Sequence, residues 1–188
     1  MNTRDYLVEL GEAAMRQNGY GGFSYADLAK QAGIRKASIH HHFPAKADLG
    51  LAVLDKYADR LVTALNDIKA TSRTGAQALQ ACITLYRLAS DDGDTMCLCS
   101  ALAADRTILT EPMKQMLDRA NRKVIAWLET VLLQGRQDRS IVVPGLPAND
   151  AVAVLAQLQG AQLLAKASGD VALFDTALSS IQSRMSRS

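Results

Sequence analysis

The sequence predicts an all-α fold of about nine helices, and two observations favour it. Apolar residues recur every three or four positions through most of the 188 residues, which is the helical spacing. β-branched residues cluster only at 141–143, where Pro144 follows directly. A hydrophobic content of 48% and a charged content of 21% are typical of a chain with a buried core, so a disordered or collagen-like protein is excluded.

Three short helices are expected at the N-terminal end, each bounded by a local signal. Gly19 stops the first helix, and Ser24 and Asp27 have the spacing of a capping box that starts the second. Gly33 breaks the second helix, and Pro44 ends the third. The expected ranges are about 3–17, 24–32 and 35–43.

Longer helices are expected in the rest of the chain. A long amphipathic helix covers about 46–70, with an apolar residue in phase from Leu49 to Ile68. Further helices are expected near 75–90, 96–104, 111–134, 149–168 and 171–185. The change from short helices to long ones near residue 50 predicts two domains, 1–48 and 49–188.

Residues 24–43 have the pattern of a helix-turn-helix. Two helices that cross closely need a small residue on the first, a residue tolerant of positive φ in the turn, and a branched apolar residue on the second. Ala29, Gly33 and Ile39 meet these needs, and Leu28 and Phe43 extend the apolar wedge. The full set favours a DNA-binding pair over a purely structural helical hairpin.

The outer face of the third helix suits a DNA groove. If Ile39 points inward, Ala37 and His41 point outward, because each residue advances about 100°. Residues 24–46 contain four basic residues and one acidic residue, an excess of three in a chain whose net charge is only +2. A small residue lets the helix approach base edges in the major groove, while lysines reach phosphates.

These residues together resemble the TetR family of transcriptional regulators. The run GIRKASIHHHFPAKADL, Gly33 to Leu49, is similar to that family's recognition helix and the helix after it, and the match covers about residues 4–55. The family often has Gly where this chain has Ala37 and Tyr where it has His40.

The resemblance implies a cytoplasmic, ligand-responsive regulator without a cofactor. It would bind a pseudo-palindromic operator in double-stranded DNA as a homodimer, most simply as a repressor that a small-molecule effector releases. The long fourth helix would link the DNA-binding domain, 1–48, to an effector-binding and dimerisation domain, 49–188. The residues expected to contact DNA are Ser24, Tyr25, Arg35, Lys36, Ala37, Ser38, His40, His41 and Lys46.

The last two helices predict the dimer interface. Residues 149–168 are apolar on all sides, and the final helix has a narrow seam with spacings of three and four. A four-helix bundle between two subunits explains both patterns, and the alternative is a central core helix of a monomer. The residues expected at the interface are Val154, Leu158, Ala161, Val171, Phe174, Leu178 and Ile181.

An apolar stripe along 111–134 is either plain core or one wall of an effector pocket. The resemblance places that pocket between this helix and residues 75–104. The residues expected to line it are Tyr57, Leu61, Tyr86, Cys97, Leu102, Met116 and Trp127.

The three cysteines are too few for a disulfide framework and favour a reducing compartment. The segment CLCSALAAD, which begins at Cys97, is similar to that of a TetR subgroup in which a cysteine senses electrophiles or oxidants. The alternative is that Cys97 and Cys99 are small buried apolar residues.

Other functional classes are disfavoured. All three histidines are consecutive, His40 to His42, so they cannot converge on one metal ion or serve a distant nucleophile, and we expect neither a metal site nor an enzyme. The apolar run 151–165 is shorter than the roughly 18–20 residues that cross a bilayer, so no membrane association is expected. The remaining alternative is a helical adaptor whose helix-turn-helix contacts protein.

Overall fold

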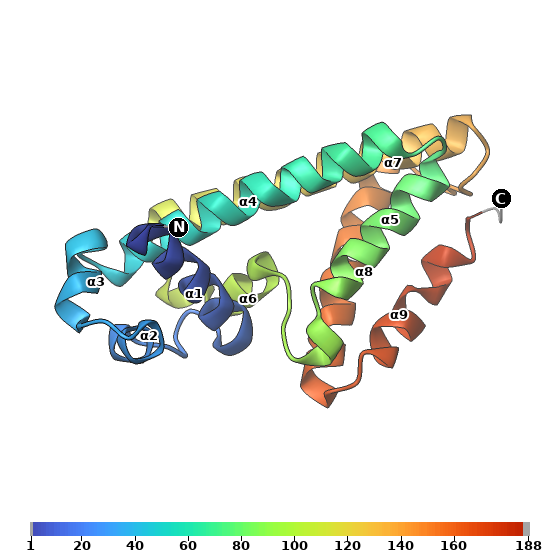
Figure 1. The fold of residues 1–188 in the computed structure, drawn as a ribbon. Helices are drawn as coiled ribbons and strands as arrows, with labels where there is room; N and C mark the ends of the chain where they lie inside the picture. The colour runs from blue at the N-terminus through green and yellow to red at the C-terminus, as the bar shows by residue number, and fades with distance from the viewer. Residues whose placement is uncertain (1, 186–188) are drawn as a thin grey trace. The chain divides into compact units, whose positions relative to one another are not determined.

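The computed structural model describes residues 2–185, and this range contains nine α-helices and no named strand (Figure 1). The predicted all-α class is confirmed, and every expected helix is present with its ends shifted by a few residues. The α-helices are α1 (Thr3–Asn18), α2 (Tyr25–Ala32), α3 (Lys36–His42), α4 (Lys46–Thr71), α5 (Gly75–Leu88), α6 (Leu98–Ala104), α7 (Glu111–Gln137), α8 (Pro147–Ser168) and α9 (Ala172–Gln182). Two 3₁₀ helices, η1 (Asp91–Gly93) and η2 (Arg106–Ile108), flank α6.

The β-branched run at 141–143 contributes a single backbone bridge, between Ile141 and Met185. Within residues 2–185, no helix is long and apolar enough to cross a membrane.

The chain forms two compact units. The first contains the residues up to Arg60 together with Leu98–Ala120, and the second contains Leu61–Cys97 together with the residues from Asn121 onward. The helix-turn-helix predicted for residues 1–48 therefore lies in the first unit, together with the first part of α4, α6 and the start of α7.

The first unit is built around α1, which packs against α2 and α6. Gly11 lets α1 approach α4 closely, because a Cβ atom there would lie 3.2 Å from a methyl group of Val53 and 3.3 Å from one of Leu49. The fully buried side chains of this core come from α1, α2, α3 and α4 and from the residue after α3. They include Leu7, Met15, Leu28, Ile39, Phe43 and Leu49.

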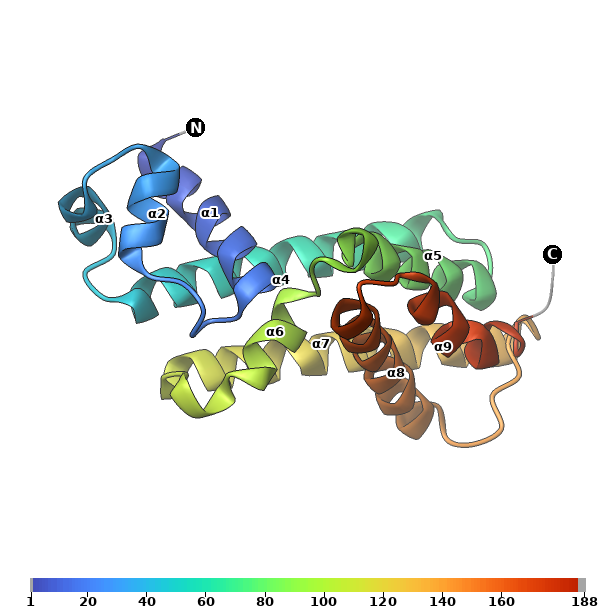
Figure 2. The same cartoon turned by 90° about the horizontal axis from the view of Figure 1, so that it is seen from below.

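The second unit is built around α8, which packs against α9 and α5 (Figure 2). The helices α5 and α7 meet backbone to backbone, because a Cβ atom at Gly75 would lie 2.3 Å from the amide nitrogen of Gly135. Gln162 of α8 is fully buried and joins two other segments: its Oε1 accepts from the Cys97 N–H at 3.1 Å, and its Nε2 donates to the Tyr86 carbonyl at 2.7 Å. These bonds satisfy a polar side chain that would otherwise be costly to bury.

Candidate nucleic-acid interface

The helix-turn-helix is formed by α2, a glycine turn and α3. Ser24 caps α2: its hydroxyl accepts from the Asp27 N–H at 3.3 Å, and the Asp27 carboxylate accepts from the Ser24 N–H at 2.8 Å. The Ser24 hydroxyl also donates to the Asp27 carboxylate at 2.7 Å, and this bond, followed by the one from the Ser24 N–H, lowers the pKa of Asp27. Gly33 ends α2 at φ +66° in the left-handed region, where glycine is favoured. The predicted capping box and turn are confirmed.

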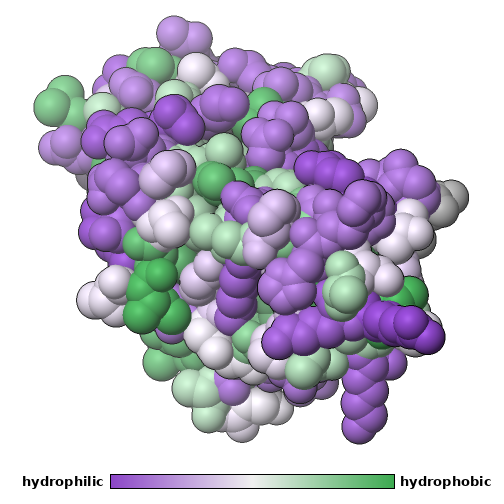
Figure 3. Space-filling view, turned by 90° about the vertical axis from the view of Figure 1, so that its left-hand side faces the viewer, coloured by the Kyte–Doolittle hydropathy of each residue, from purple (hydrophilic) through white to green (hydrophobic). Residues whose placement is uncertain are grey.

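The orientation of α3 follows from its two inward residues. Ile39 and Phe43 are buried at 0% and 2% exposure, which places the opposite face in solvent. The exposed residues of this region include most of those expected to contact DNA, namely Ser24, Arg35, Lys36, Ala37, Ser38, His40 and His41. Figure 3 faces the end of the chain that carries α3 and shows mainly hydrophilic surface. The exposed face of α3 is therefore polar and carries a small residue, Ala37, and this is the face that we expect to meet the major groove of DNA.

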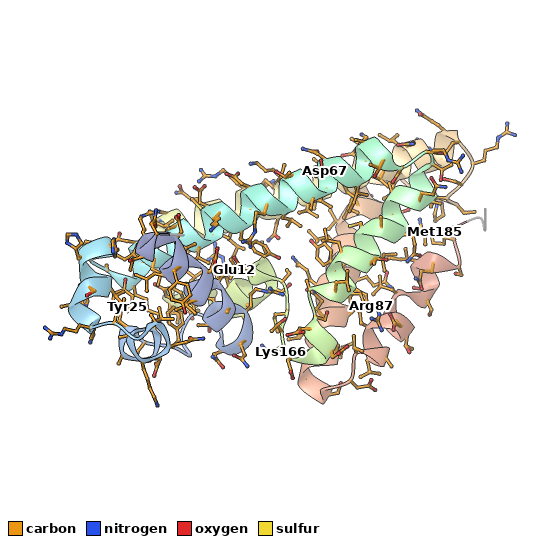
Figure 4. All side chains as sticks on the ribbon, viewed as in Figure 1. Glu12, Tyr25, Asp67, Arg87, Lys166 and Met185 are labelled. Atoms are coloured by element: carbon orange, nitrogen blue, oxygen red, sulfur yellow. The ribbon has the colours of Figure 1, made fainter. Side chains whose placement is uncertain are left out.

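Tyr25, which is labelled in Figure 4, is buried and its hydroxyl has partners within the protein, so its predicted contact with DNA stays a prediction. Its side chain is only 6% exposed, and its hydroxyl lies 3.0 Å from the Phe43 carbonyl and 2.7 Å from the Ala45 carbonyl, to which it donates. Burial, and then the negative charge of Asp48, raises the pKa of Tyr25 to about 12. The residue therefore ties the end of α3 to the start of α2.

His40 shares this task with Tyr25. Its Nδ1 lies 3.1 Å from the Pro44 carbonyl, and its ring meets the Tyr25 ring edge-on at 4.9 Å. A carbonyl oxygen only accepts, so Nδ1 carries the proton in this bond, and Nε2 is the other ring nitrogen with which His40 can meet DNA.

Lys46, the first residue of α4, is folded onto the α1–α2 loop. Its ammonium donates to the Phe23 carbonyl at 2.5 Å and lies 4.8 Å and 4.1 Å from the ring centres of Tyr20 and Phe23. Burial lowers the pKa of Lys46, and the nearby carboxylates of Asp105 and Asp27 oppose this effect. An ammonium has three donors, so a phosphate contact would share it with these internal partners.

Sequence reasoning missed Arg4, which lies beside the end of α3. Its guanidinium carbon is 5.0 Å from the centre of the Phe43 ring, and the residue is exposed. The signal was present as a basic residue in the first turn of α1, but only packing shows that this turn is close to Phe43.

The residues expected to line an effector pocket are divided between the two units. Tyr57, Leu102 and Met116 belong to the first unit, and Leu61, Tyr86, Cys97 and Trp127 belong to the second. Leu102, Tyr86, Cys97 and Trp127 are buried. The pocket therefore stays a prediction.

The three cysteines are all free and buried. Burial raises the pKa of the Cys82 thiol to about 12. No cluster of metal-binding side chains occurs among residues 2–185.

The residues predicted for the dimer interface stay a prediction, and most of them are buried within the single chain. Val154, Leu158, Ala161, Phe174, Leu178 and Ile181 are at most 5% exposed, and Val171 is half-buried. They are covered within the chain, because the seam of α9 packs on α8 and α5 of the same molecule. The large apolar residues that α8 leaves in solvent are Val152, Leu163 and Leu164, at 52%, 55% and 56% exposure.

Comparisons with known proteins agree with this arrangement. Residues 7–53 match the family model described as bacterial regulatory proteins, tetR family. The HTH-type transcriptional repressor NemR of Escherichia coli (strain K12) is 30% identical over 185 residues, which cover 96% of this chain and 92% of that protein. The HTH-type transcriptional regulator CymR of Pseudomonas putida is 29% identical over 142 residues, 72% of this chain and 68% of CymR.

Solved structures show the same fold over nearly the whole chain. A TetR-family regulator from Agrobacterium tumefaciens has a TM-score of 0.92 at 29% identity and covers 98% of this chain and 97% of its own. The reduced form of E. coli NemR has a TM-score of 0.83 at 26% identity and covers 99% and 98%. The chain therefore belongs to the TetR family of bacterial transcriptional regulators, which bind operator DNA as homodimers and respond to small-molecule effectors.

Proposed function

We propose that this regulator is a repressor that binds a pseudo-palindromic operator through α3 and leaves it when an effector binds. The observation that carries the proposal is the exposed face of α3, which has basic and small side chains and lies opposite the fully buried Ile39. The relative that aligns over nearly the whole chain is named a repressor, whereas the relative named an activator, FasR of Mycolicibacterium smegmatis, aligns over 44% of it.

Two kinds of contact follow from the exposed side chains. Arg35 and Lys36 stand where the turn meets α3 and suit phosphates, which bind cations without regard to sequence. Ala37 and Ser38 suit the base edges, because short side chains let the helix approach closely. His40 would use Nε2 toward DNA, since Nδ1 is held by the Pro44 carbonyl.

The test is the salt dependence of operator binding. An operator is first selected from genomic DNA with the purified protein, and its affinity is then measured by fluorescence anisotropy at several salt concentrations. The slope of log affinity against log salt concentration is negative. Lys36→Ala should reduce its magnitude by about 0.9 for each lost phosphate contact, or by about 1.8 for a dimer that places two copies of α3 on the operator. Lys69→Ala, which removes an exposed lysine at the end of α4, is the control and should leave the slope unchanged.

The alternative of a helical adaptor predicts a different result. An adaptor would show no steep salt dependence on any DNA and would select no common sequence. An unchanged slope in Lys36→Ala would refute the phosphate contact of this residue.

We also propose that the second copy docks on the exposed face of α8. This face is apolar, with Val152, Leu163 and Leu164 around the small residues Ala156 and Gly160, and a homodimer needs an apolar surface for a second copy. It differs from the residues that the sequence analysis selected, most of which are buried within the chain.

A charge placed on this face tests the dimer. Leu164→Glu should convert the protein to a monomer in sedimentation at micromolar concentration. Val142→Glu changes a side chain of similar exposure, 66%, in the loop before α8, and should leave the dimer intact. A dimer that survives Leu164→Glu together with Leu163→Glu would place the interface elsewhere.

A response to electrophiles through Cys97 or Cys99 remains a hypothesis. Both thiols are almost fully buried, at 2% and 1% exposure, so a reagent would reach them only when their surroundings open. The double variant Cys97→Ser, Cys99→Ser should lose release from the operator by quinones, aldehydes and peroxides. Normal release in this variant would assign both cysteines a structural role.

We assign the chain no enzymatic activity and a cytoplasmic place of action. Its proposed role is completed by binding to chromosomal DNA, and the consecutive histidines lie in α3, where His40 Nδ1 bonds to the Pro44 carbonyl.

A further inference from the structure

The loop between α1 and α2, residues 19–23, is held by the segment that follows α6. The Gly21 N–H donates to the Asp105 carboxylate at 3.1 Å. A Cβ atom at Gly21 would lie 3.2 Å from the terminal methyl group of Ile108, so the side chain of Ile108 is in close contact with the loop. We call Asp105, Ile108 and Met113 the loop seat. All three belong to the first unit, as does the loop.

The residues of the loop seat pack against glycines, where no side chain is present. At Gly19, with φ +76°, a Cβ atom would lie 2.6 Å from the Asp105 carboxylate oxygen. At Gly50 of α4 it would lie 2.7 Å from the methyl group of Met113 and 3.1 Å from the Tyr20 ring. Each residue of the loop seat therefore contacts a glycine. A larger residue in place of Gly19, Gly21 or Gly50 would force a neighbouring side chain to move. The contact is a close fit between backbone and side chains.

The loop in turn contacts both ends of the helix-turn-helix. It leads directly into Ser24, the cap of α2, and its Phe23 carbonyl accepts from the ammonium of Lys46, the first residue of α4. The helix α3 lies between these two points, with its end tied to Tyr25 of α2. A shift of the loop would therefore move both attachments of α3. The charge of Asp105 also favours the ammonium form of Lys46.

We propose that Asp105 is a positioning residue for DNA binding. Its hydrogen bond to the Gly21 N–H holds the α1–α2 loop so that α3 presents its exposed face in one orientation, an inference that depends on the proposed role of α3. Since α6 ends at Ala104, the residue before Asp105, movement of α6 would act on the loop through this bond. The loop seat thus links the helix-turn-helix to α6.

Asp105→Ala and Asp105→Asn separate the hydrogen bond from the charge. Asparagine keeps a side-chain oxygen that can accept from Gly21, whereas alanine does not. We expect Asp105→Ala to weaken operator binding about tenfold, as for the loss of one hydrogen bond to a charged group, and Asp105→Asn to stay within about threefold of the wild type. The Gly21 amide should exchange its hydrogen faster in Asp105→Ala, as measured by NMR.

The ratio of operator affinity to random-DNA affinity distinguishes positioning from simple destabilisation. A partly unfolded population lowers both affinities equally, whereas a misplaced α3 loses base contacts and lowers the ratio. We expect the ratio to fall in Asp105→Ala and to be restored in Asp105→Asn. An unchanged ratio in Asp105→Ala, or an equal loss in both variants, would overturn the inference.

A steric variant tests the same contact independently. Gly21→Ala should weaken operator binding because its methyl group would press on Ile108, and the double variant Gly21→Ala, Ile108→Ala should recover affinity. Gly145→Ala, where a Cβ atom meets nothing within 4 Å, is the matched control. A double variant no better than Gly21→Ala would count against the loop seat. Failure of the wild-type protein to select a common DNA sequence would instead count against the proposed function, so the two failures are distinct.

Discussion

The hydroxyl of Tyr25 gives the sharpest test of how α3 is held. Tyr25→Phe removes one oxygen atom from a side chain that is 6% exposed and leaves its ring in place. The buried Phe43 carbonyl and the partly buried Ala45 carbonyl, 3.0 Å and 2.7 Å from that oxygen, then lose this donor. A lost hydrogen bond that leaves buried acceptors unpaired costs about 1–2 kcal/mol.

Stability is the property that should change. For a chain of this size, about 2–4 °C of melting temperature corresponds to each kcal/mol, so we expect a fall of about 2–8 °C, measured by circular dichroism. Tyr6→Phe, which removes the same atom from a half-buried tyrosine of α1, is the control. Operator affinity should fall less than tenfold, because His40 still holds the Pro44 carbonyl.

The alkaline range offers a second measurement on the same pair of proteins. The pKa of Tyr25 is raised by burial from 10.0 to about 12, so the folded state favours the neutral hydroxyl. The stabilisation is therefore complete below pH 10 and is lost as the pH rises from 10 to about 12. The difference in unfolding free energy between the wild type and Tyr25→Phe should shrink over that range.

One outcome would refute the internal role of Tyr25. If Tyr25→Phe unfolds like the wild type and yet binds the operator at least tenfold more weakly, the hydroxyl contacts DNA directly, as the sequence predicted.

Three further predictions concern single positions. Gly33→Ala should lower the unfolding free energy in urea by about 1 kcal/mol, since the residue has φ +66° while its Cβ atom would meet nothing within 4 Å, so the cost is conformational. Cys82 should remain unmodified when the native protein is treated briefly with iodoacetamide at pH 8 and analysed by mass spectrometry, because burial raises its pKa to about 12; rapid alkylation would contradict its burial. Arg60→Ala should destabilise the protein more than Glu12→Gln in the same urea assay, because it leaves the Glu12 carboxylate, which is 11% exposed, charged and without its partner, whereas Arg60 is 50% exposed. Equal losses would show that the burial of the carboxylate has no effect.

Local signals predicted most of the secondary structure and the helix-turn-helix. The capping box at Ser24 and Asp27 and the stop at Gly33 act over three or four residues, so their geometry could be predicted without any knowledge of the rest of the chain. The same holds for the inward position of Ile39, which follows from the helical period.

The faces of α8 show where such reasoning stops. The helix is apolar on all sides, and spacing alone does not distinguish the side that meets α9 of the same chain from the side open to a second copy. Packing assigned Leu158 to the interior and Leu164 to the surface. The predicted interface stays a prediction, and the seam of α9 on which it relied packs against α8 and α5 of the same chain.

The amino-acid sequence by itself determined the all-α fold, the helix-turn-helix and the family, because each of these is specified by neighbouring residues and their periodicity. Only the tertiary structure decided that Tyr25 is internal, that Lys46 lies on Tyr20 and Phe23, and that Asp105 holds Gly21. The last contact joins residues 84 positions apart, and no local pattern specifies such a pair. A side chain's partner is set by which helices pack together, and that packing depends on the whole core.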